Sequence, residues 1–402
     1  MRIRERRPPR DRIGGFWHGC VPVGLGSRRV AHGAPCSPGH GVRALPRLIL
    51  VGFAMRRRQA GRDCRFRLHD LSIRLMIGTH KESAAMGIGS FTSITVFGGA
   101  TLDRIAMSSA KPVPGASNPG TMRALPGGVG FNVARVLARL GHTVRLVTRI
   151  GADQAGQEVL AAARAAGVFT TTVGISPTRP TATYQAALDD KGDLVIGIAD
   201  MEITTEMTPA SVAAAAREAP TADLWIVDAN LPVETIDFLI GEAVATSRPV
   251  VALPVSPAKA VRLAPLRDRI GLLFANRKEA AVLLGRDPDE KGLSATFLAE
   301  QIGRRPTPDV VITDAGGMLV ARSDGKIRSF LPFRANVRSV NGAGDALAAG
   351  TIHGLAGGRT LFEAVLHGLA AAAITVESEG TLPDELTASM IATRIGAERI
   401  AP

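Results

Sequence analysis

Short apolar runs alternate with longer amphipathic segments along residues 91–402. The clearest amphipathic segment begins at Asn132, where apolar residues recur at the i, i+3, i+4, i+7 spacing of one buried helix face. These apolar positions are Val133, Val136, Leu137 and Leu140. Gly141 follows directly, as is typical of a helix end. The pattern predicts a helix that packs on a core through one face.

The alternation continues through most of the chain. We predict strands at residues 93–97, 144–147, 224–227, 250–253, 270–274 and 310–313, and helices at residues 132–140, 157–166, 233–244, 278–284, 346–355 and 361–378. Repeated strand–helix units favour an α/β fold with a doubly wound, mainly parallel sheet and helices on both faces. Residues 98–130 are rich in glycine and are interpreted as mostly loop, with no strand at residues 121–126.

One segment interrupts this alternation. Residues 181–188 and 193–198 are predicted to be two strands joined by the turn at residues 189–192, whose sequence is DDKG. Together with residues of about 100–125, the segment at about 181–203 is expected to form a small β sheet. Ligands in doubly wound folds bind outside the carboxyl ends of the strands, so a sheet projecting there can serve as a lid.

Charge divides the chain in two. The whole sequence has 48 Lys and Arg against 36 Asp and Glu, but residues 1–90 hold 18 of the basic residues and only 5 of the acidic ones. Residues 91–402 therefore have 30 basic and 31 acidic residues and are close to neutral. The strong positive charge belongs to the Arg-rich leader and says nothing about the partners of the rest.

The leader shows no sustained helix or strand period, and its longest apolar run, residues 48–55, falls far short of the ~20 residues that span a bilayer. We interpret residues 1–90 as a disordered extension or as a start assigned too early, with Met55, Met76 and Met86 as later candidates. An organelle transit peptide and a nucleic-acid arm are the alternatives, and few aromatic residues support the second. All three cysteines lie here, so residues 91–402 suit a reducing, cytoplasmic location without a membrane span.

The heptad SVNGAGD at residues 339–345 carries the strongest chemical signal. Gly342, Ala343 and Gly344 open a predicted helix, whose first N–H groups and dipole favour an anion. Asp345 in the first turn is within reach of a bound anion. An anion site beside a carboxylate base is what phosphoryl transfer to an alcohol requires. The structural alternative is a glycine turn with a capping Asp.

A second glycine cluster, GGVGFN at residues 127–132, precedes the amphipathic helix. Its glycines allow a ligand to approach the backbone at Gly128, and Asn132 can cap the helix or bind a hydroxyl group. The dinucleotide-binding pattern is excluded because the third glycine and a preceding strand are both lacking. A plain loop with a helix cap is the alternative.

Other polar residues follow predicted strands. Asp103 can accept hydrogen bonds from two sugar hydroxyls, or it is a solvated loop residue. Asn276 and Glu279 have capping-box spacing, and they can also serve a Mg²⁺ ion on nucleotide phosphates. The turn at residues 313–317 can support a nucleotide or be only a turn. Tyr184 can cover a nucleobase or pack the hairpin, and His142, His353 and His367 are interpreted as isolated structural residues.

Together these motifs resemble the ribokinase-like (PfkB-type) sugar and nucleoside kinases from about residue 93 to 377, with finer similarity to the pseudouridine kinase branch. That similarity lies at residues 117–120, 181–184, 199–203, 228–230 and 254–256. The resemblance implies a doubly wound domain with a small β lid, a nucleoside or sugar substrate, ATP and Mg²⁺, and a possible homodimer through the lid. It implies Asp345 as base; an anion hole at Gly342, Ala343 and Gly344; substrate contacts at Asp103, Gly128, Asn132, Tyr184 and Asn230; nucleotide contacts at Asn276, Thr313 and Gly316; and Glu279 toward the metal.

Three departures from the family pattern stand out. Residues 339–341 read SVN where the family usually has Asp-Thr-x, which leaves the monovalent cation open. Ala315 replaces a common Gly, and Leu253 stands where the pseudouridine branch has Asp. The alternatives are another sugar or nucleoside kinase of the family, a nucleoside-binding regulator without catalysis, and an RNA-associated protein that uses its leader.

Overall fold

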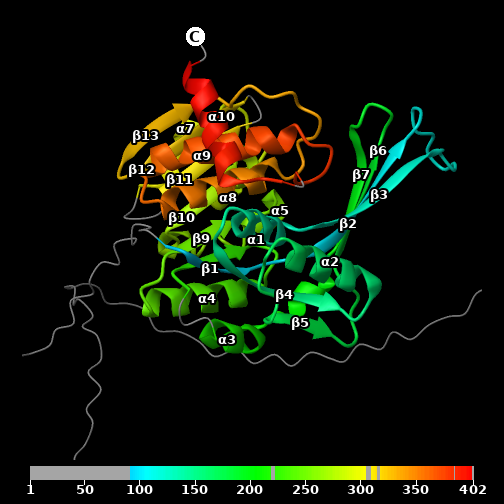
Figure 1. Cartoon of the computed structure of the whole chain (residues 1–402), viewed down its shortest axis with the longest axis horizontal. Coiled ribbons are helices and arrows are strands. Elements are labelled where there is room, and N and C mark those ends of the chain that lie inside the picture. The colour runs from blue at the N-terminus through cyan, green and yellow to red at the C-terminus, as the bar shows by residue number, and fades with distance from the viewer. Residues whose placement is uncertain (1–90, 219–221, 305–308, 315–316, 384, 401–402) are drawn as a thin grey trace, which may run out of the picture. The chain divides into compact units, whose positions relative to one another are not determined.

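The computed structural model describes residues 91–218, 222–304, 309–314, 317–383 and 385–400. The Arg-rich leader, Ala315 and Gly316 lie outside the described residues. A nine-stranded sheet forms the body, and a four-stranded sheet projects from it (Figure 1). The α/β class predicted from the alternating pattern is confirmed.

The nine-stranded sheet is mainly parallel. Its order is β13 (Lys326–Phe330), β12 (Met318–Ser323), β11 (Asp309–Asp314), β10 (Leu272–Asn276), β9 (Val250–Leu253), β8 (Leu224–Asp228), β1 (Ser93–Phe97), β4 (Thr143–Gly151) and β5 (Val173–Ser176). All neighbours from β11 to β5 pair in parallel, whereas β12 and β13 extend one edge by antiparallel pairing.

Helices cover both faces of this sheet and create two hydrophobic cores (Figure 1). One face carries α1 (Val129–Arg139), α2 (Gln154–Ala165), α8 (Ala343–Ala356), α9 (Leu361–Val376) and α10 (Ala388–Ile400). The other carries α3 (Pro209–Glu218), α4 (Val233–Ala245), α5 (Pro257–Ala260), α6 (Arg277–Leu283) and α7 (Ala295–Ile302). Short 3₁₀ helices lie at Glu202–Glu206 (η1) and Arg267–Arg269 (η2).

The two cores explain why the central strands are continuously apolar. In β8, Leu224 and Ile226 pack into the core beside α1 and α8, whereas Trp225 and Val227 pack into the opposite core. A strand buried on both faces has no polar side to alternate with. Its only charged residue is Asp228, where the strand ends.

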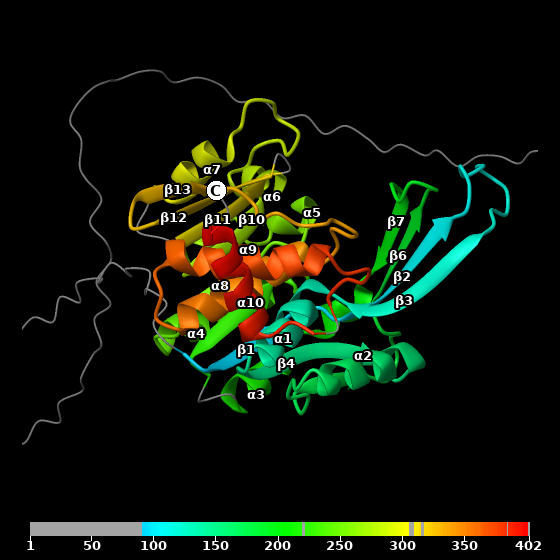
Figure 2. The same ribbon diagram turned by 45° about the horizontal axis from the view of Figure 1, so that its top comes forward.

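The four-stranded sheet has the order β3 (Gly120–Gly127), β2 (Thr101–Ser108), β6 (Thr183–Leu188) and β7 (Leu194–Asp200) (Figure 2). The predicted hairpin at residues 181–198 is thus confirmed as β6 and β7. The prediction of loop at residues 98–130 is wrong, because β2 and β3 form an antiparallel pair there. The sequence pattern did not indicate β3 because the strand contains Gly120, Pro126 and Gly127, which have weak strand preference. Its pairing with β2 overrides that preference.

Several further elements were not predicted, namely β5, β12, β13, α3, α5, α7 and α10. Helices α1 and α2 also begin earlier than expected, at Val129 and Gln154. Among the described residues, no helix combines the length and the apolar character needed to cross a membrane.

Candidate active site

The root of the four-stranded sheet lies at the carboxyl edge of the body. Strand β1 leads through Gly98 and Gly99 into β2, and β3 leads through Gly128 into α1. Because β1, β8, β10 and β11 run parallel, their carboxyl ends all open onto this edge. The polar residues that follow these strands are therefore brought to one side of the molecule.

The SVNGAGD heptad forms the start of α8. Gly342 is the N-cap residue and adopts a left-handed conformation with φ 75°, and a Cβ there would clash with the carbonyl oxygen of Thr381. Ala343 and Gly344 lie in the first turn, whose N–H groups have no partner inside the helix, and the Ala343 N–H donates to the carbonyl oxygen of Val340 at 3.4 Å. Glycine is required at position 342 for both conformation and space, and the turn presents the positive end of the helix dipole.

Asp345 projects from this first turn and is held by the second glycine cluster. The side-chain amide Nδ2 of Asn132 donates to Oδ2 of Asp345 at 2.8 Å, across 213 residues of sequence. Asn132 is 3% exposed, and its other polar atom, Oδ1, is buried without a hydrogen-bond partner. A buried acceptor without a donor beside a carboxylate is suited to receive a hydroxyl group of a ligand.

The pKa of Asp345 is raised to about 7, first because burial disfavours the charged form. The hydrogen bond from Asn132 lowers this pKa, and the negative charges of Asp228, Asp103 and Glu279 raise it. The side chain nevertheless keeps partial exposure. A half-buried carboxylate with a pKa near neutrality is able to accept a proton and release it.

Asp103 lies on β2 at the root of the small sheet. Thr101 Oγ1 donates to Asp103 Oδ1 at 2.6 Å, and Gly127 on the neighbouring strand leaves space that a Cβ would take from the carboxylate. Burial raises the pKa of Asp103, and the bond from Thr101 lowers it in part. Gly127 is therefore needed because a larger residue would collide with the Asp103 carboxylate, whether or not a ligand is bound.

The backbone of Gly128 approaches the segment between β1 and β2. Its φ is 102°, and a Cβ at this position would lie 2.6 Å from the carbonyl oxygen of Gly99. The Phe131 N–H donates to the same carbonyl at 3.4 Å. The segment that links β1 to β2 and the segment that links β3 to α1 are thus in direct backbone contact at the root of the small sheet.

A hydrogen-bonded chain follows the end of β8. The buried Asp228 accepts from the side-chain amide of Asn230 at 3.1 Å, and Lys259 Nζ donates to Asn230 Oδ1 at 2.5 Å. Lys259 lies on the short helix α5, after the strained Val255 with φ 71°. The sequence motifs include Asn230 but not Lys259, whose only sequence signal is its place just beyond the carboxyl end of β9.

Asn276 and Glu279 form the predicted capping box at the start of α6. Asn276 Oδ1 accepts from the Glu279 N–H, and Glu279 Oε2 accepts from the Asn276 N–H, both at 2.9 Å. Glu279 is 7% exposed and its pKa is raised, chiefly by burial. Thr313 is the register partner of Asn276 on β11, so the two residues lie side by side. The capping interpretation is correct, and Oε1 of Glu279 is the oxygen not used by the cap.

Tyr184 lies on β6 in register with Asp103 on β2, so both side chains are on one face of the small sheet. The Tyr184 hydroxyl lies over Gly197 of β7, where a Cβ would come within 2.5 Å of it. The ring therefore packs on its own hairpin, on the face that carries Asp103.

His142, His353 and His367 are not isolated, and that prediction is wrong. His142 Nε2 and His353 Nδ1 lie 3.0 Å apart, and the rings of His353 and His367 are 6.0 Å apart between centroids. His353 lies on α8, His367 lies on α9 and His142 follows α1, so the packing of α8 against both α9 and α1 brings the three together, which sequence spacing cannot show. Within the described residues, no group of three or more His, Cys, Asp or Glu side chains is arranged to hold a metal ion.

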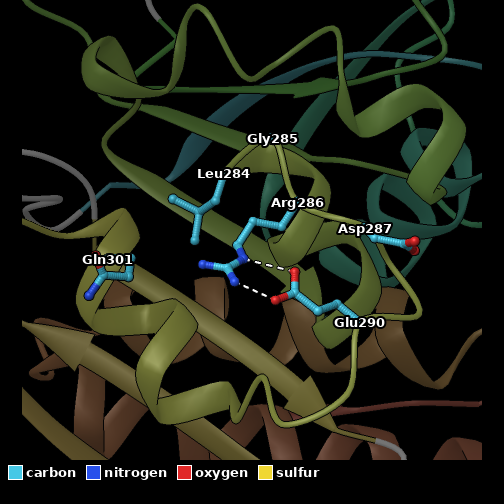
Figure 3. Close-up of a pocket in the computed structure, with 6 residues that line it drawn as sticks. All are labelled: Leu284, Gly285, Arg286, Asp287, Glu290 and Gln301. Carbon is cyan, nitrogen blue, oxygen red and sulfur yellow. Dashed lines mark hydrogen bonds and ion pairs between the residues drawn. The ribbon is translucent and has the colours of Figure 1, made fainter.

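A surface hollow of about 490 Å³ lies away from these residues (Figure 3). Its lining includes Leu284, Arg286 and Glu290, which follow the carboxyl end of α6, and Gln301 near the end of α7. Helix α6 starts at the carboxyl edge of the sheet, so its far end faces the opposite edge. The hollow is therefore not part of the site around Asp345.

Comparison with known families decides the class of protein. The model of the pfkB family carbohydrate kinases matches residues 92–388. The chain belongs to this family. Kinases of this family transfer a phosphoryl group from ATP to a sugar or nucleoside, so this PfkB kinase is an ATP-dependent enzyme with a small-molecule acceptor. A regulator without catalysis is not favoured by this assignment.

Individual relatives agree with the family. This PfkB kinase is 30% identical over 312 residues to the pseudouridine kinase of Escherichia coli (strain K12), covering 76% of the chain and 97% of that protein. A carbohydrate kinase from Agrobacterium tumefaciens has a similar structure, with a TM-score of 0.65, 37% identity, and coverage of 75% of this chain and 96% of that chain. Arabidopsis thaliana ribokinase complexed with ribose and ATP shares the fold at 19% identity, a TM-score of 0.62, and coverage of 77% and 99%.

Proposed function

We propose that this kinase phosphorylates the 5′-hydroxyl of pseudouridine, with Asp345 as the general base. The observation that carries the proposal is the Asn132–Asp345 hydrogen bond, which joins the two glycine motifs around a carboxylate whose pKa is about 7. A base poised near neutral pH combines adequate deprotonation with adequate proton affinity. The choice of pseudouridine is supported by the 30% identity to the bacterial pseudouridine kinase over nearly its whole length.

In the proposed reaction, Asp345 takes the proton of the 5′-hydroxyl as the hydroxyl oxygen attacks the γ-phosphorus of ATP. The bond from that phosphorus to the β,γ-bridging oxygen breaks, ADP leaves, and the product is the nucleoside 5′-phosphate. The first-turn N–H groups of α8, at Ala343 and Gly344 behind the N-cap Gly342, stabilise the negative charge on the transferred group.

The acceptor is proposed to lie between the small sheet and α1. Asp103 accepts hydrogen bonds from sugar hydroxyls, and the unpartnered Oδ1 of Asn132 accepts one more. Asn230 contributes from the end of β8, and Gly128 contributes through its backbone as the N-cap residue of α1. Tyr184 covers the nucleobase from the face of the small sheet that also carries Asp103.

The nucleotide is proposed to lie over the carboxyl ends of β10 and β11, against Asn276, Thr313 and Gly316. The neighbouring Asn276 and Thr313 fit this role by position, and Glu279 fits an indirect metal role because Oε1 is outside the capping box. Bound Mg²⁺ neutralises charge on the phosphates and orients them. A single nearby carboxylate suits Mg²⁺, which keeps most of its water ligands.

A substrate panel tests the proposal. Purified enzyme is assayed with Mg-ATP against pseudouridine, uridine, adenosine, ribose and fructose, with ADP release and product mass as readouts. We expect the highest kcat/KM with pseudouridine. Turnover of another sugar or nucleoside without turnover of pseudouridine contradicts the substrate assignment and leaves the kinase class intact.

The four-stranded sheet is proposed to act as a lid and as a dimer interface. Every residue of the edge strand β7 is exposed, including Leu194, Val195, Ile196 and Ile198 at 55–62%. An apolar edge strand of this kind favours pairing, and a second copy of the same chain is the proposed partner. Sedimentation of the wild type and of Ile198→Lys tests it: a dimer that becomes a monomer is expected, and a wild-type monomer at micromolar concentration excludes it.

Two further expectations complete the proposal. A cytoplasmic location is supported by the absence of cysteine from residues 91–402, since no disulfide there needs an oxidising compartment. The domain limits are proposed as a leader at residues 1–90 and a kinase domain at residues 91–402. Mass mapping of the native N-terminus tests the first limit.

A further inference from the structure

Asp228 ends β8, and its side chain is completely buried. Its carboxylate accepts four hydrogen bonds: from the N–H of Gly99 at 3.0 Å, of Gly130 at 2.9 Å and of Asn230 at 2.9 Å, and from the side-chain amide of Asn230 at 3.1 Å. Gly98 and Gly130 pack so closely that a Cβ at either position would press on the carboxylate. All of these contacts are made to segments at the carboxyl edge of the sheet, outside its hydrophobic cores.

The donors belong to three separate segments of the acceptor site. Gly99 precedes β2, which carries Asp103. Gly130 lies in the first turn of α1, two residues before Asn132. Asn230 follows β8 and contacts Lys259. One carboxylate therefore joins the entry to the small sheet, the start of α1 and the turn after β8.

We propose that Asp228, as an ionised carboxylate, is a positioning residue of the phosphoryl-acceptor site. It does so without contact with substrate, by holding the segments of Asp103, Asn132 and Asn230 in one arrangement. The inference rests on the proposed function only in taking these three residues as the border of the acceptor site.

The hydrogen bonds themselves argue for the ionised form. All four partners of Asp228 are N–H donors, so a proton on either oxygen would face a donor and find no acceptor among them. Burial raises the pKa of Asp228, and these bonds lower it in part. Geometry and hydrogen-bond chemistry thus favour a buried negative charge at neutral pH.

That charge acts on two groups of the site. Around Asp345, the negative charges that raise its pKa are those of Asp228, Asp103 and Glu279, and the hydrogen bond of Asn132 opposes them. Around Lys259, burial lowers the pKa, Asp228 raises it and the charge of Arg262 lowers it. Neutralising Asp228 removes one of the charges that keep Asp345 basic, so the pKa of Asp345 falls.

The test compares Asp228→Asn with Asp223→Asn. Asp223, at the other end of the same strand, accepts from the N–H groups of Thr92 and Ser93 at 2.9 and 3.0 Å, far along the strand from the site. For Asp228→Asn we expect KM for the acceptor to rise about 10- to 100-fold, as for one or two lost charge-assisted bonds. We also expect the acid limb of kcat/KM to move to lower pH, while Asp223→Asn keeps both wild-type values.

Gly130→Ala distinguishes the positioning effect of Asp228 from the effect of its charge. It also tests the positioning role if Asp228→Asn does not fold. A Cβ at Gly130 comes within 2.9 Å of the Asp228 carboxylate but leaves its charge, so KM rises and the acid limb stays. Wild-type KM in either folded variant, or an unmoved acid limb in folded Asp228→Asn, overturns the inference. The assay uses whichever acceptor the unmodified enzyme phosphorylates, so failure of pseudouridine contradicts only the proposed substrate.

Discussion

Asn132 donates from its side-chain amide to the carboxylate of Asp345 at 2.8 Å and thereby joins the start of α1 to the start of α8. The two helices begin at glycine turns, and the bonded residues lie 213 positions apart in sequence. Their side chains meet because both helices start at the carboxyl edge of the same sheet. The pKa of Asp345 therefore depends on Asn132, which lies in the segment that is proposed to hold the acceptor.

Replacing Asp345 by Asn tests its role as base. We expect kcat to fall by about 10²–10⁴, because a general base is lost without a change in size. Thermal stability should be unchanged or higher above pH 7, since the native structure raises the pKa of Asp345 and so disfavours its charged form. Kinetics and a melting curve on one preparation check both parts, and near-normal kcat removes Asp345 from the mechanism.

The pH dependence should follow the same carboxylate. Because the proposed base Asp345 would act in its deprotonated form and its pKa is about 7, kcat/KM should rise with pH up to about 7 and then level off. Asn132→Ala removes the hydrogen bond that lowers this pKa, so the acid limb should move to higher pH. Asn118→Ala, which alters an amide in the exposed loop of the small sheet, is the control. An acid limb unchanged by Asn132→Ala contradicts the assignment of the limb to Asp345.

Glu279→Gln separates capping from nucleotide binding. We expect KM for Mg-ATP to rise by more than KM for the acceptor, because Glu279 is proposed to serve the metal on the nucleotide phosphates through its Oε1 atom, which the capping box does not use. Glu363 makes the same capping box with Thr360 at the start of α9 and is exposed, so Glu363→Gln is a matched control. Gln keeps an acceptor oxygen for the capping box, so both variants should keep nearly wild-type unfolding free energy, but only Glu279→Gln should alter the kinetics. Equal kinetics in the two variants would assign Glu279 to capping alone.

We expect the free energy of unfolding to decrease in mild acid because of the histidine cluster. Burial and the neighbouring His353 lower the pKa of His142 from 6.5 to about 4. A lowered native pKa stabilises the fold above pH 6.5, and this contribution disappears as pH falls toward 4. The difference amounts to at most about 3 kcal/mol, given the partial exposure of the ring. Urea unfolding from pH 7.5 to 4.5 should show a flatter decline for His142→Gln than for the wild type, and parallel declines would contradict the prediction.

Much of the fold could be predicted from the sequence because it depends on interactions between residues close together in the chain. The apolar face after Asn132, the continuous apolar run of β8 and the capping box at Asn276 each follow from contacts within a few residues or from burial of a whole strand. Strand β3 was missed because its residues are mostly exposed and include Gly and Pro, so that pairing with β2 is its main support. Elements held by distant partners leave little local pattern.

By itself the sequence determined the alternation of strands and helices, the two glycine turns and the carboxylates that follow the strands, because each depends on backbone geometry and nearby hydrogen bonds. Only the tertiary structure decided which of these residues meet. The bond from Asn132 to Asp345, the four donors around Asp228 and the contact of Lys259 with Asn230 join segments from different parts of the chain. The pKa of Asp345 was likewise decided there, because burial and the surrounding charges exist only once the chain has folded.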